Sequence, residues 1–146
     1  MQPVFGVKAG SRVALNCQRE IAVACLEGAD ILFVEYSGCG NTIPELRETA
    51  MSHARTFFVE KDEDDGSDRI QSTIRKHNLK SSHIKVIGVN TDCCVYRTVQ
   101  GLTARLPMST IEVVADACDS DFSHINGLAK IASLGGVRIS NQGTIQ

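Results

Sequence analysis

The 146-residue sequence lacks any apolar run that approaches the length of a membrane span, which takes about 20 residues. Its first residues are not a charged segment followed by an apolar one, so they do not predict a secretory signal. Internal repeats, low-complexity segments and a plausible linker are also absent. We therefore expect a cytoplasmic protein without a membrane partner, in which residues 1–146 form a single domain.

The sequence also lacks the patterns of a nucleic-acid or metal site. Its 15 Lys and Arg residues against 17 Asp and Glu residues leave a net charge of -2, with no basic footprint for nucleic acid. The four histidines have no ligand spacing, and the six cysteines include no Cys-x-x-Cys pair and no disulfide framework. Aligning Gly66 with the glycine of an EF-hand puts Lys61 at the first ligand position, which excludes calcium. We expect free thiols, no metal and no cofactor.

What the sequence does contain is a distinctive turn, Gly-Val-Asn-Thr-Asp-Cys-Cys-Val at residues 88–95, which we name the cysteine turn. The apolar run at 84–89 before it is typical of a buried parallel strand. An apolar helical stripe follows it, made of Val95, Val99, Leu102 and Leu106. Cys94 is therefore expected in the first turn of a helix, where free N–H groups and the helix dipole lower a thiol pKa.

Strands and helices are predicted to alternate along the whole chain. Helices are expected to be capped by Ser11, Thr42 with Glu45, Ser67, and either Ser120 or Ser123, and Gly28 should end the first helix. Strands are expected at 31–36, 56–59, 84–89, 110–115 and 137–139. Such alternation predicts an α/β fold, a three-layer αβα arrangement around a Rossmann-like parallel sheet. Sites in such sheets lie at the carboxyl ends of strands, where the cysteine turn falls.

The cysteine turn resembles the Gly-x-x-Thr-Asp-x-Cys-Val motif of the isochorismatase-like cysteine hydrolases, which include nicotinamidases and carbamoyl-amide hydrolases. The resemblance implies that Cys94 is the catalytic nucleophile and that the peptide between Val89 and Asn90 is cis. It further implies that the N–H groups of Asn90 and Cys94 form an oxyanion hole. Asp92 belongs to the same motif, although it is most simply a helix cap or a local brace of the turn.

The resemblance also assigns residues outside the turn. Lys61, at the end of a strand, matches the family lysine that acts as the charge partner of the cysteine; a solvated loop lysine is the alternative. The loop at 37–42 is expected to lie over the pocket, where Tyr36, Asn41 or Thr42 contacts substrate; a turn capped by Thr42 is the alternative. Metal-binding nicotinamidases carry an Asp and histidines here, so the resemblance implies no metal.

One family element has no counterpart in the sequence. Met1, Gln2 and Phe5 match the end of the family's first strand, whose catalytic Asp would come immediately before Met1. That strand is central in the family fold, and without it two strands keep unpaired edges, which is costly. We therefore expect a domain truncated at its N-terminus relative to the family and a longer native chain. A degenerate protein without the acid/base group is the alternative.

Two functions follow. The first is a cysteine-dependent hydrolase that cleaves a small amide or a related C–N substrate through a thioester, with ammonia or a small amine as the leaving group. The second is a catalytically inactive isochorismatase-like protein that acts in ligand binding or assembly. The resemblance also implies a homo-oligomer.

Overall fold

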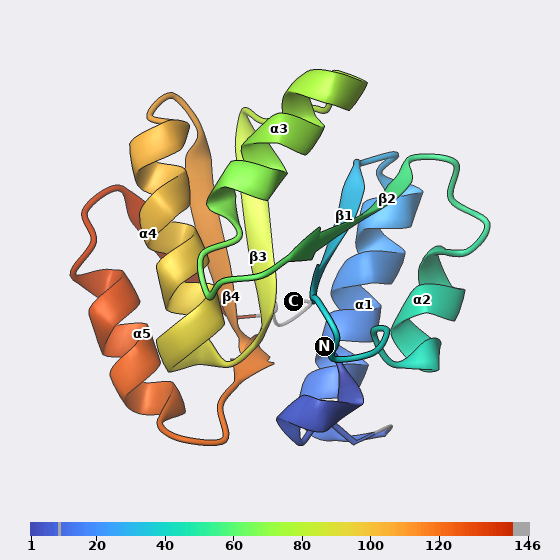
Figure 1. Ribbon diagram of the computed structural model, residues 1–146, viewed down its shortest axis with the longest axis horizontal. Helices are drawn as coiled ribbons and strands as arrows, with labels where there is room; N and C mark the ends of the chain where they lie inside the picture. The colour runs from blue at the N-terminus through green and yellow to red at the C-terminus, as the bar shows by residue number, and fades with distance from the viewer. Residues whose placement is uncertain (9, 142–146) are drawn as a thin grey trace, which may run out of the picture.

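Figure 1 shows a computed structural model of the protein, which describes residues 1–8 and 10–141. Helices and strands alternate as predicted. The strands are β1 (Ile31–Tyr36), β2 (Thr56–Lys61), β3 (His83–Val89), β4 (Thr110–Asp119) and β5 (Val137–Ser140). The helices are α1 (Arg12–Leu26), α2 (Pro44–Ala50), α3 (Ser67–His77), α4 (Tyr96–Arg105) and α5 (His124–Ala132). A 3-10 helix covers Pro3–Phe5, and a π-helical turn covers Thr91–Val95.

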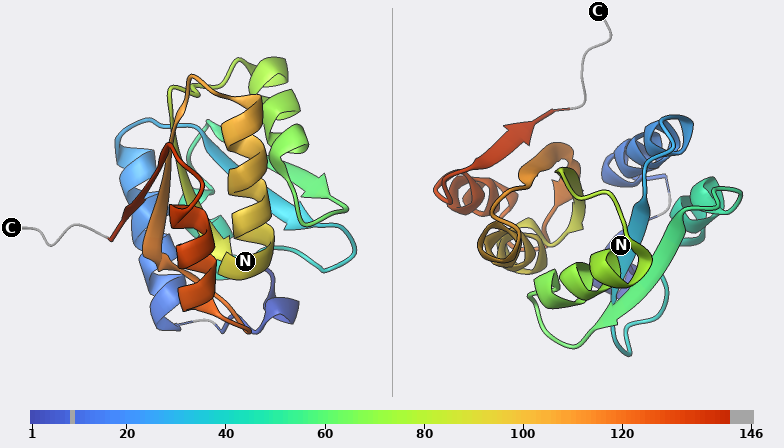
Figure 2. Two further views of the ribbon diagram at one scale, coloured as in Figure 1. Left: turned by 90° about the vertical axis from the view of Figure 1, so that its left-hand side faces the viewer. Right: turned by 90° about the horizontal axis from the view of Figure 1, so that it is seen from above.

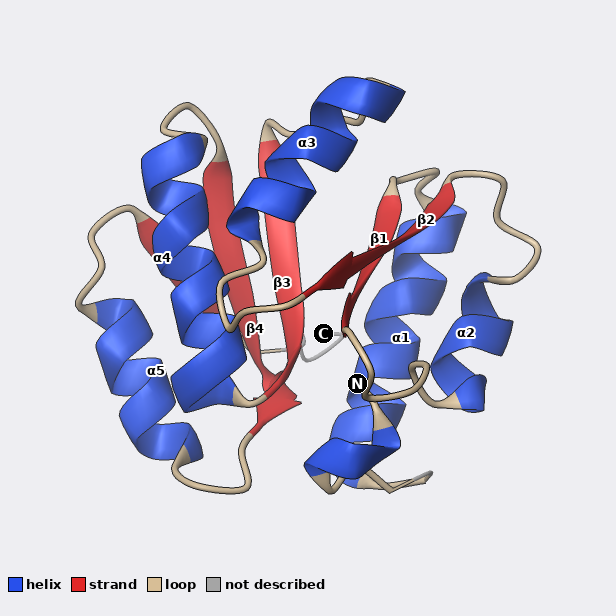
Figure 3. Ribbon diagram, viewed as in Figure 1, coloured by secondary structure: helices blue, strands red, loops and turns tan. Residues whose placement is uncertain are grey.

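The strands form two parallel sheets (Figure 3). One contains β1 and β2, in register from Ile31 opposite Thr56 to Tyr36 opposite Lys61. The other has the order β3-β4-β5. The α/β fold class is confirmed, and the sheet is split at the place where the resemblance puts a further strand.

Helices cover both sheets and make three layers (Figure 2). α1 contacts α2, β1 and β4 on one face, whereas α3, α4 and α5 form a connected row on the other. The buried residues form two hydrophobic clusters, and β4 contributes to both. Successive side chains of a strand point to opposite faces, so Val113 belongs to one cluster and Val114 to the other. Within the described ranges, no helix is both long and apolar enough to cross a membrane.

The observed helix starts agree only in part with those predicted from the sequence. Ser11 caps α1 by accepting a hydrogen bond from Ala14, and Ser123, one of the two proposed residues, caps α5. The predicted capping box of Thr42 and Glu45 is wrong, because α2 begins at Pro44 after Ile43 without a side-chain cap.

Proline at the first position explains the late start of α2, since its fixed φ suits a helix and it has no N–H to satisfy. The predicted Ser67 cap is displaced by one residue: Gly66 precedes α3, and Ser67 is its first residue. Gly28, with a φ of 65°, follows α1 as predicted.

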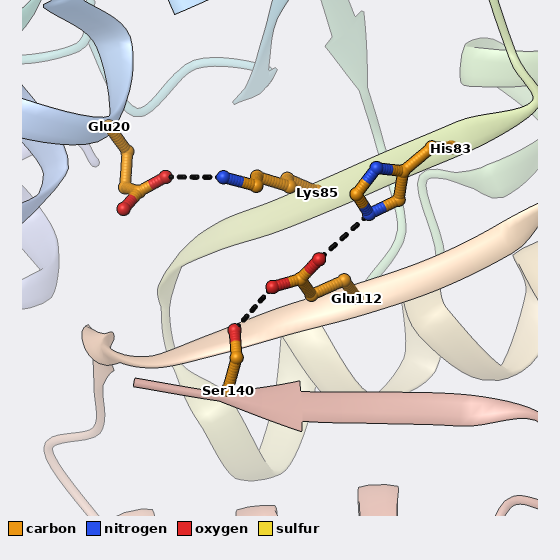
Figure 4. Close-up of polar contacts among 5 residues, drawn as sticks. All are labelled: Glu20, His83, Lys85, Glu112 and Ser140. Carbon is orange, nitrogen blue, oxygen red and sulfur yellow. Dashed lines mark hydrogen bonds and ion pairs between the residues drawn. The ribbon is translucent and has the colours of Figure 1, made fainter. Parts of the chain in front are cut away.

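A polar cluster joins the strands of the larger sheet (Figure 4). The buried Glu112 carboxylate bonds to the Ser140 hydroxyl and lies 2.8 Å from Nε2 of His83. The Ser140 hydroxyl lowers the pKa of Glu112, His83 lowers it further, and burial opposes both. Nearby, Nζ of Lys85 on β3 lies 3.2 Å from a carboxylate oxygen of Glu20 on α1. These contacts attach β4 to both of its neighbours and β3 to α1.

Candidate active site

Polar contacts to the end of β4, the loop after it and α5 hold the cysteine turn in place. Thr91 is fully buried, and its hydroxyl donates to the carbonyl of Asp119 at 3.0 Å and lies 2.8 Å from Nδ1 of His124. The Asp92 carboxylate accepts from the hydroxyl of Ser120 at 2.5 Å. Asp92 is therefore a brace to the loop after β4 rather than a helix cap. The Val89–Asn90 peptide is cis, which confirms the expectation from the resemblance.

A glycine of α5 makes room for the turn. A Cβ atom at Gly127 would lie 2.6 Å from the Asp92 nitrogen and 2.7 Å from the Thr91 carbonyl carbon. Contacts this short do not occur in folded proteins, so any larger residue at Gly127 must push α5 and the turn apart. The position of Cys94 thus depends on α5 as well as on β3 and α4.

Cys94 lies within the π-helical turn and faces residues that follow β2. Its Sγ atom lies 3.5 Å from Oδ1 of Asp64, and the Lys61 side chain also contacts it. Nζ of Lys61 donates to the Asp64 carbonyl at 2.5 Å. The site therefore joins a thiol from one sheet with an ammonium and a carboxylate from the other.

Lys61 is not the solvated loop residue of the alternative interpretation. It is buried, and its ammonium lies 5.4 Å from the centre of the Tyr36 ring, within cation–π range. The loop beside it is attached to α4, because Thr98 accepts from the Gly66 N–H and donates to the Asp64 carbonyl. These bonds fix the carboxylate and the ammonium relative to the helix that follows Cys94.

The pKa of the Cys94 thiol departs from the prediction. Burial raises it above its ordinary value, Lys61 lowers it, and Asp64 raises it, with a net shift upward. The predicted lowering is therefore wrong for the described chain. Removing a thiolate from water costs more here than the nearby cation returns, so the resting group is a thiol.

The residues proposed to contact substrate fall into two groups. Tyr36 and Thr42 line a cavity of about 390 Å³ that also reaches Lys61 and Cys94. Thr42 is buried, and within the described part of the chain its Oγ1 atom has no hydrogen-bond partner. Asn41 is exposed and does not line this cavity, so its substrate contact stays a prediction.

Two residues of the site were missed as functional candidates. Asp64 stands out by no sequence motif, and its contact with Cys94 spans 30 residues of sequence. Gln2 is buried and orders the loop over the cavity: its side chain donates to the carbonyls of Tyr36 and Gly40 and accepts from the Tyr36 N–H. The match of Met1 and Gln2 to the family strand end was the available signal for Gln2.

No family model matches the sequence, and no curated protein matches it. Solved structures are similar at low identity. The nicotinamidase SaPncA from Staphylococcus aureus is 19% identical with a TM-score of 0.74, over 90% of this chain and 88% of that one. The fold is that of the isochorismatase-like hydrolases.

Two further similar structures show that proteins with different names share this fold. An isochorismatase-like hydrolase from Alkaliphilus metalliredigens is 14% identical with a TM-score of 0.70, over 90% of this chain and 80% of that one. The MAR1 ribonuclease from Caenorhabditis elegans is 19% identical with a TM-score of 0.74, over 88% and 66% of the two chains. Because proteins with different names share this fold, activity has to be argued from the side chains of the site.

Proposed function

We propose that this chain carries the site of a cysteine-dependent hydrolase that cleaves a small amide or a related C–N substrate. The observation that carries the proposal is the convergence of Cys94, Lys61 and Asp64, of which Cys94 and Lys61 line the cavity. A nucleophile, a cation and a proton acceptor within contact distance are the groups that acyl transfer through a thioester needs.

The raised pKa of Cys94 assigns a part to Asp64. A resting thiol must lose its proton to attack, and the Asp64 carboxylate contacts Sγ. In the proposed reaction the thiol proton passes to Asp64 as the S–C bond forms. The same proton then goes to the leaving nitrogen as the C–N bond breaks, which releases ammonia or a small amine. Water hydrolyses the thioester to a carboxylic acid and restores the thiol.

The other proposed roles follow from position. The Lys61 ammonium stabilises the thiolate, and the N–H groups of Asn90 and Cys94 hold the developing oxyanion. Tyr36 and Thr42 contact the substrate from the cavity wall, and the free Oγ1 atom of Thr42 supports this role because a buried hydroxyl favours a polar partner.

The chain supplies a matched control for the test, because Cys93 adjoins Cys94 and is also a free thiol. Small amides, with nicotinamide first, are incubated with the protein, and released ammonia and acyl-enzyme mass are measured. We expect Cys94→Ala to reduce turnover by at least about a thousandfold, whereas Cys93→Ala changes it by less than about threefold. Equal effects of the two substitutions would contradict the assignment of Cys94.

An inactive ligand-binding or assembly protein is the second candidate function, and the upward pKa shift of Cys94 favours it. It predicts that small amides protect the protein against unfolding without being hydrolysed, and that Cys94→Ala leaves this protection intact. Slow turnover of any amide that depends on Cys94 excludes it.

A cytoplasmic homo-oligomer remains our proposal for the state of the protein. Large apolar side chains are exposed where α5 begins, with Phe122 at 75% and Ile125 at 79% exposure. Exposed apolar side chains that lie close together are typical of contacts between protein surfaces. Sedimentation of the protein with Phe122→Ser and Ile125→Ser tests whether this patch joins subunits.

A further inference from the structure

The loop after β2 brings an excess of negative charge to the candidate site, and we name it the acidic loop. It follows Lys61 directly and consists of Asp62, Glu63, Asp64 and Asp65. The first three of these side chains are exposed, and Oδ1 of Asp64 lies 3.5 Å from Sγ of Cys94. A molecule that approaches Cys94 from solvent therefore meets carboxylates close to the thiol.

Neighbouring cations offset this charge only in part. Residues 61–69 contain five carboxylates and two cations, Lys61 and Arg69. Arg69 lies 3.3 Å from Asp62, and both side chains are more than half exposed, so water weakens the pair. Lys61 is buried, and its ammonium donates to the Asp64 carbonyl. Within the described ranges, no ion pair joins Glu63 or Asp64 to a cation.

Two further cations, Arg97 and Lys130, lie away from the cavity. They lie over the ring of Tyr96, 5.5 and 5.6 Å from its centre. Tyr96 does not line the cavity that Cys94 and Lys61 share. The acidic loop therefore keeps its excess negative charge on the side of Cys94 that faces the cavity.

Aromatic rings line the cavity beside the acidic loop. Phe5 and Tyr36 both line it, and their ring centres are 6.3 Å apart. Partial burial raises the pKa of the Tyr36 hydroxyl, and the carboxylates of Asp64 and Asp62 also raise it, so this ring lies within the field of the loop. The face of an aromatic ring is negative, and rings next to carboxylates suit an organic cation.

An independent observation indicates that the same cavity takes a polar ligand group. Thr42 is 3% exposed and lines the cavity, yet in the part of the chain that the structure describes its Oγ1 atom has no partner. Buried hydroxyls are nearly always hydrogen-bonded, so a bound molecule with a donor or an acceptor is favoured here. A primary amide offers both.

We propose that the substrate of this site is a small amide that also carries a positive charge, an ammonium or a quaternary nitrogen, and that Asp62 and Glu63 select for it. The inference rests on the proposed hydrolase function and names its substrate class. The amide carbon lies at Cys94 and the cation lies toward the acidic loop. The same carboxylates disfavour an amide that carries a negative charge.

Thiol reagents of opposite charge measure this preference without any hydrolysis. In Cys93→Ala protein, Cys94 is modified by a cationic and by an anionic methanethiosulfonate, peptide mass mapping follows each reaction, and each rate is divided by the rate with mercaptoethanol. We expect the cationic reagent to be favoured at least about tenfold at low salt, and by at least about threefold less in about 0.5 M NaCl. A preference below about twofold at low salt would overturn the proposal.

A pair of variants tests whether the acidic loop is the source of the preference. Glu63→Gln removes one charge from the loop, whereas Glu48→Gln removes the same charge from an exposed side chain on α2. The cationic preference should fall about threefold in Glu63→Gln and change by less than about 1.5-fold in Glu48→Gln. Equal changes in the two variants would assign the preference to net charge alone and overturn selection by the loop.

Two amides with the same ring extend the test to the substrate. Nicotinamide is neutral, and 1-methylnicotinamide adds a fixed positive charge; each competes with a neutral methanethiosulfonate for Cys94. We expect 1-methylnicotinamide to protect Cys94 at a concentration at least about fivefold lower. Equal protection by the two, no protection by either, or a preference for nicotinamide would overturn the proposal.

Failure of this inference is distinguishable from failure of the proposed function. Turnover that does not depend on Cys94 would contradict the hydrolase assignment and would leave the charge preference of the thiol as measured. Loss of the charge preference, with Cys94-dependent hydrolysis of a neutral amide, would contradict only the substrate class.

Discussion

The two sheets differ in how well they are supported, and the candidate site lies between them. In the larger sheet β4 has a neighbour on each side. Ile111 on β4, Leu102 on α4 and Ile131 on α5 are each at most 1% exposed. The smaller sheet has two strands, and Phe58 on β2 remains 47% exposed. The thiol comes from the larger sheet and its charged partners from the smaller one, so reactivity depends on how the two are aligned.

α1 is one described connection between the sheets. It contacts both β1 and β4, and the Asn16 amide donates to the backbone carbonyl of Asp116 at 2.6 Å. At the amino ends of the strands, the Asp30 carboxylate adds contacts to Arg55 and to the Lys80 N–H. Thr98 of α4 adds bonds to Gly66 and Asp64 in the loop after β2. The predictions below separate damage within the larger sheet from damage to the alignment of the two sheets.

The largest effect is expected from the core of the larger sheet. Leu102→Ala removes a fully buried side chain and should lower the free energy of unfolding by about 2–5 kcal/mol. Urea denaturation measures the loss. A decrease below about 1 kcal/mol would show that α4 is not packed on this sheet as described.

Gly127→Ala should have a smaller effect on stability and a specific effect on the cysteine turn. The added methyl group meets backbone atoms of Thr91 and Asp92, which costs about 1–3 kcal/mol. Alkylation of Cys94 should also change, because the turn moves. The matched control is Gly135→Ala, where a Cβ meets no atom within 4 Å; equal destabilisation by both substitutions would refute the close contact.

Glu112→Gln should lower the stability at neutral pH by about 1 kcal/mol through weaker bonds to Ser140 and His83. The pKa of Glu112 is lowered in the folded protein, so the stabilisation it gives is present above the ordinary value of 4.5 and is lost as the pH falls through the folded pKa. Unfolding measured at neutral pH and in steps below 4.5 should show a shallower loss for Glu112→Gln. An identical slope in both proteins contradicts this assignment.

Much of the fold and part of the site could be predicted from the sequence. The order of strands and helices followed from apolar periodicity, and the cysteine turn with its cis peptide followed from a local motif. The start of α2 was missed because Pro44 determines it in place of the Thr42 side chain. A capping side chain and a proline that lie within a few residues of each other are competing signals, and either can determine where the helix starts.

The remaining features depend on contacts between distant segments. The Asp64 carboxylate reaches Cys94 only because β2 and β3 end near each other, which no spacing in the sequence encodes. The pKa of Cys94 was predicted to fall because of its place near a helix N-terminus, whereas burial by the surrounding fold raises it. The unpartnered hydroxyl of Thr42 likewise became visible only with the cavity around it.

The most direct test of the claim that the two sheets meet at Cys94 is the pH dependence of its alkylation, followed by peptide mass mapping in three proteins. Lys61 lowers and Asp64 raises the pKa of Cys94. Relative to the unaltered chain, the midpoint should therefore move to higher pH in Lys61→Met and to lower pH in Asp64→Asn. Opposite shifts of this sign support a site shared between the sheets. Unchanged midpoints, or a shift in the same direction in both variants, would contradict it.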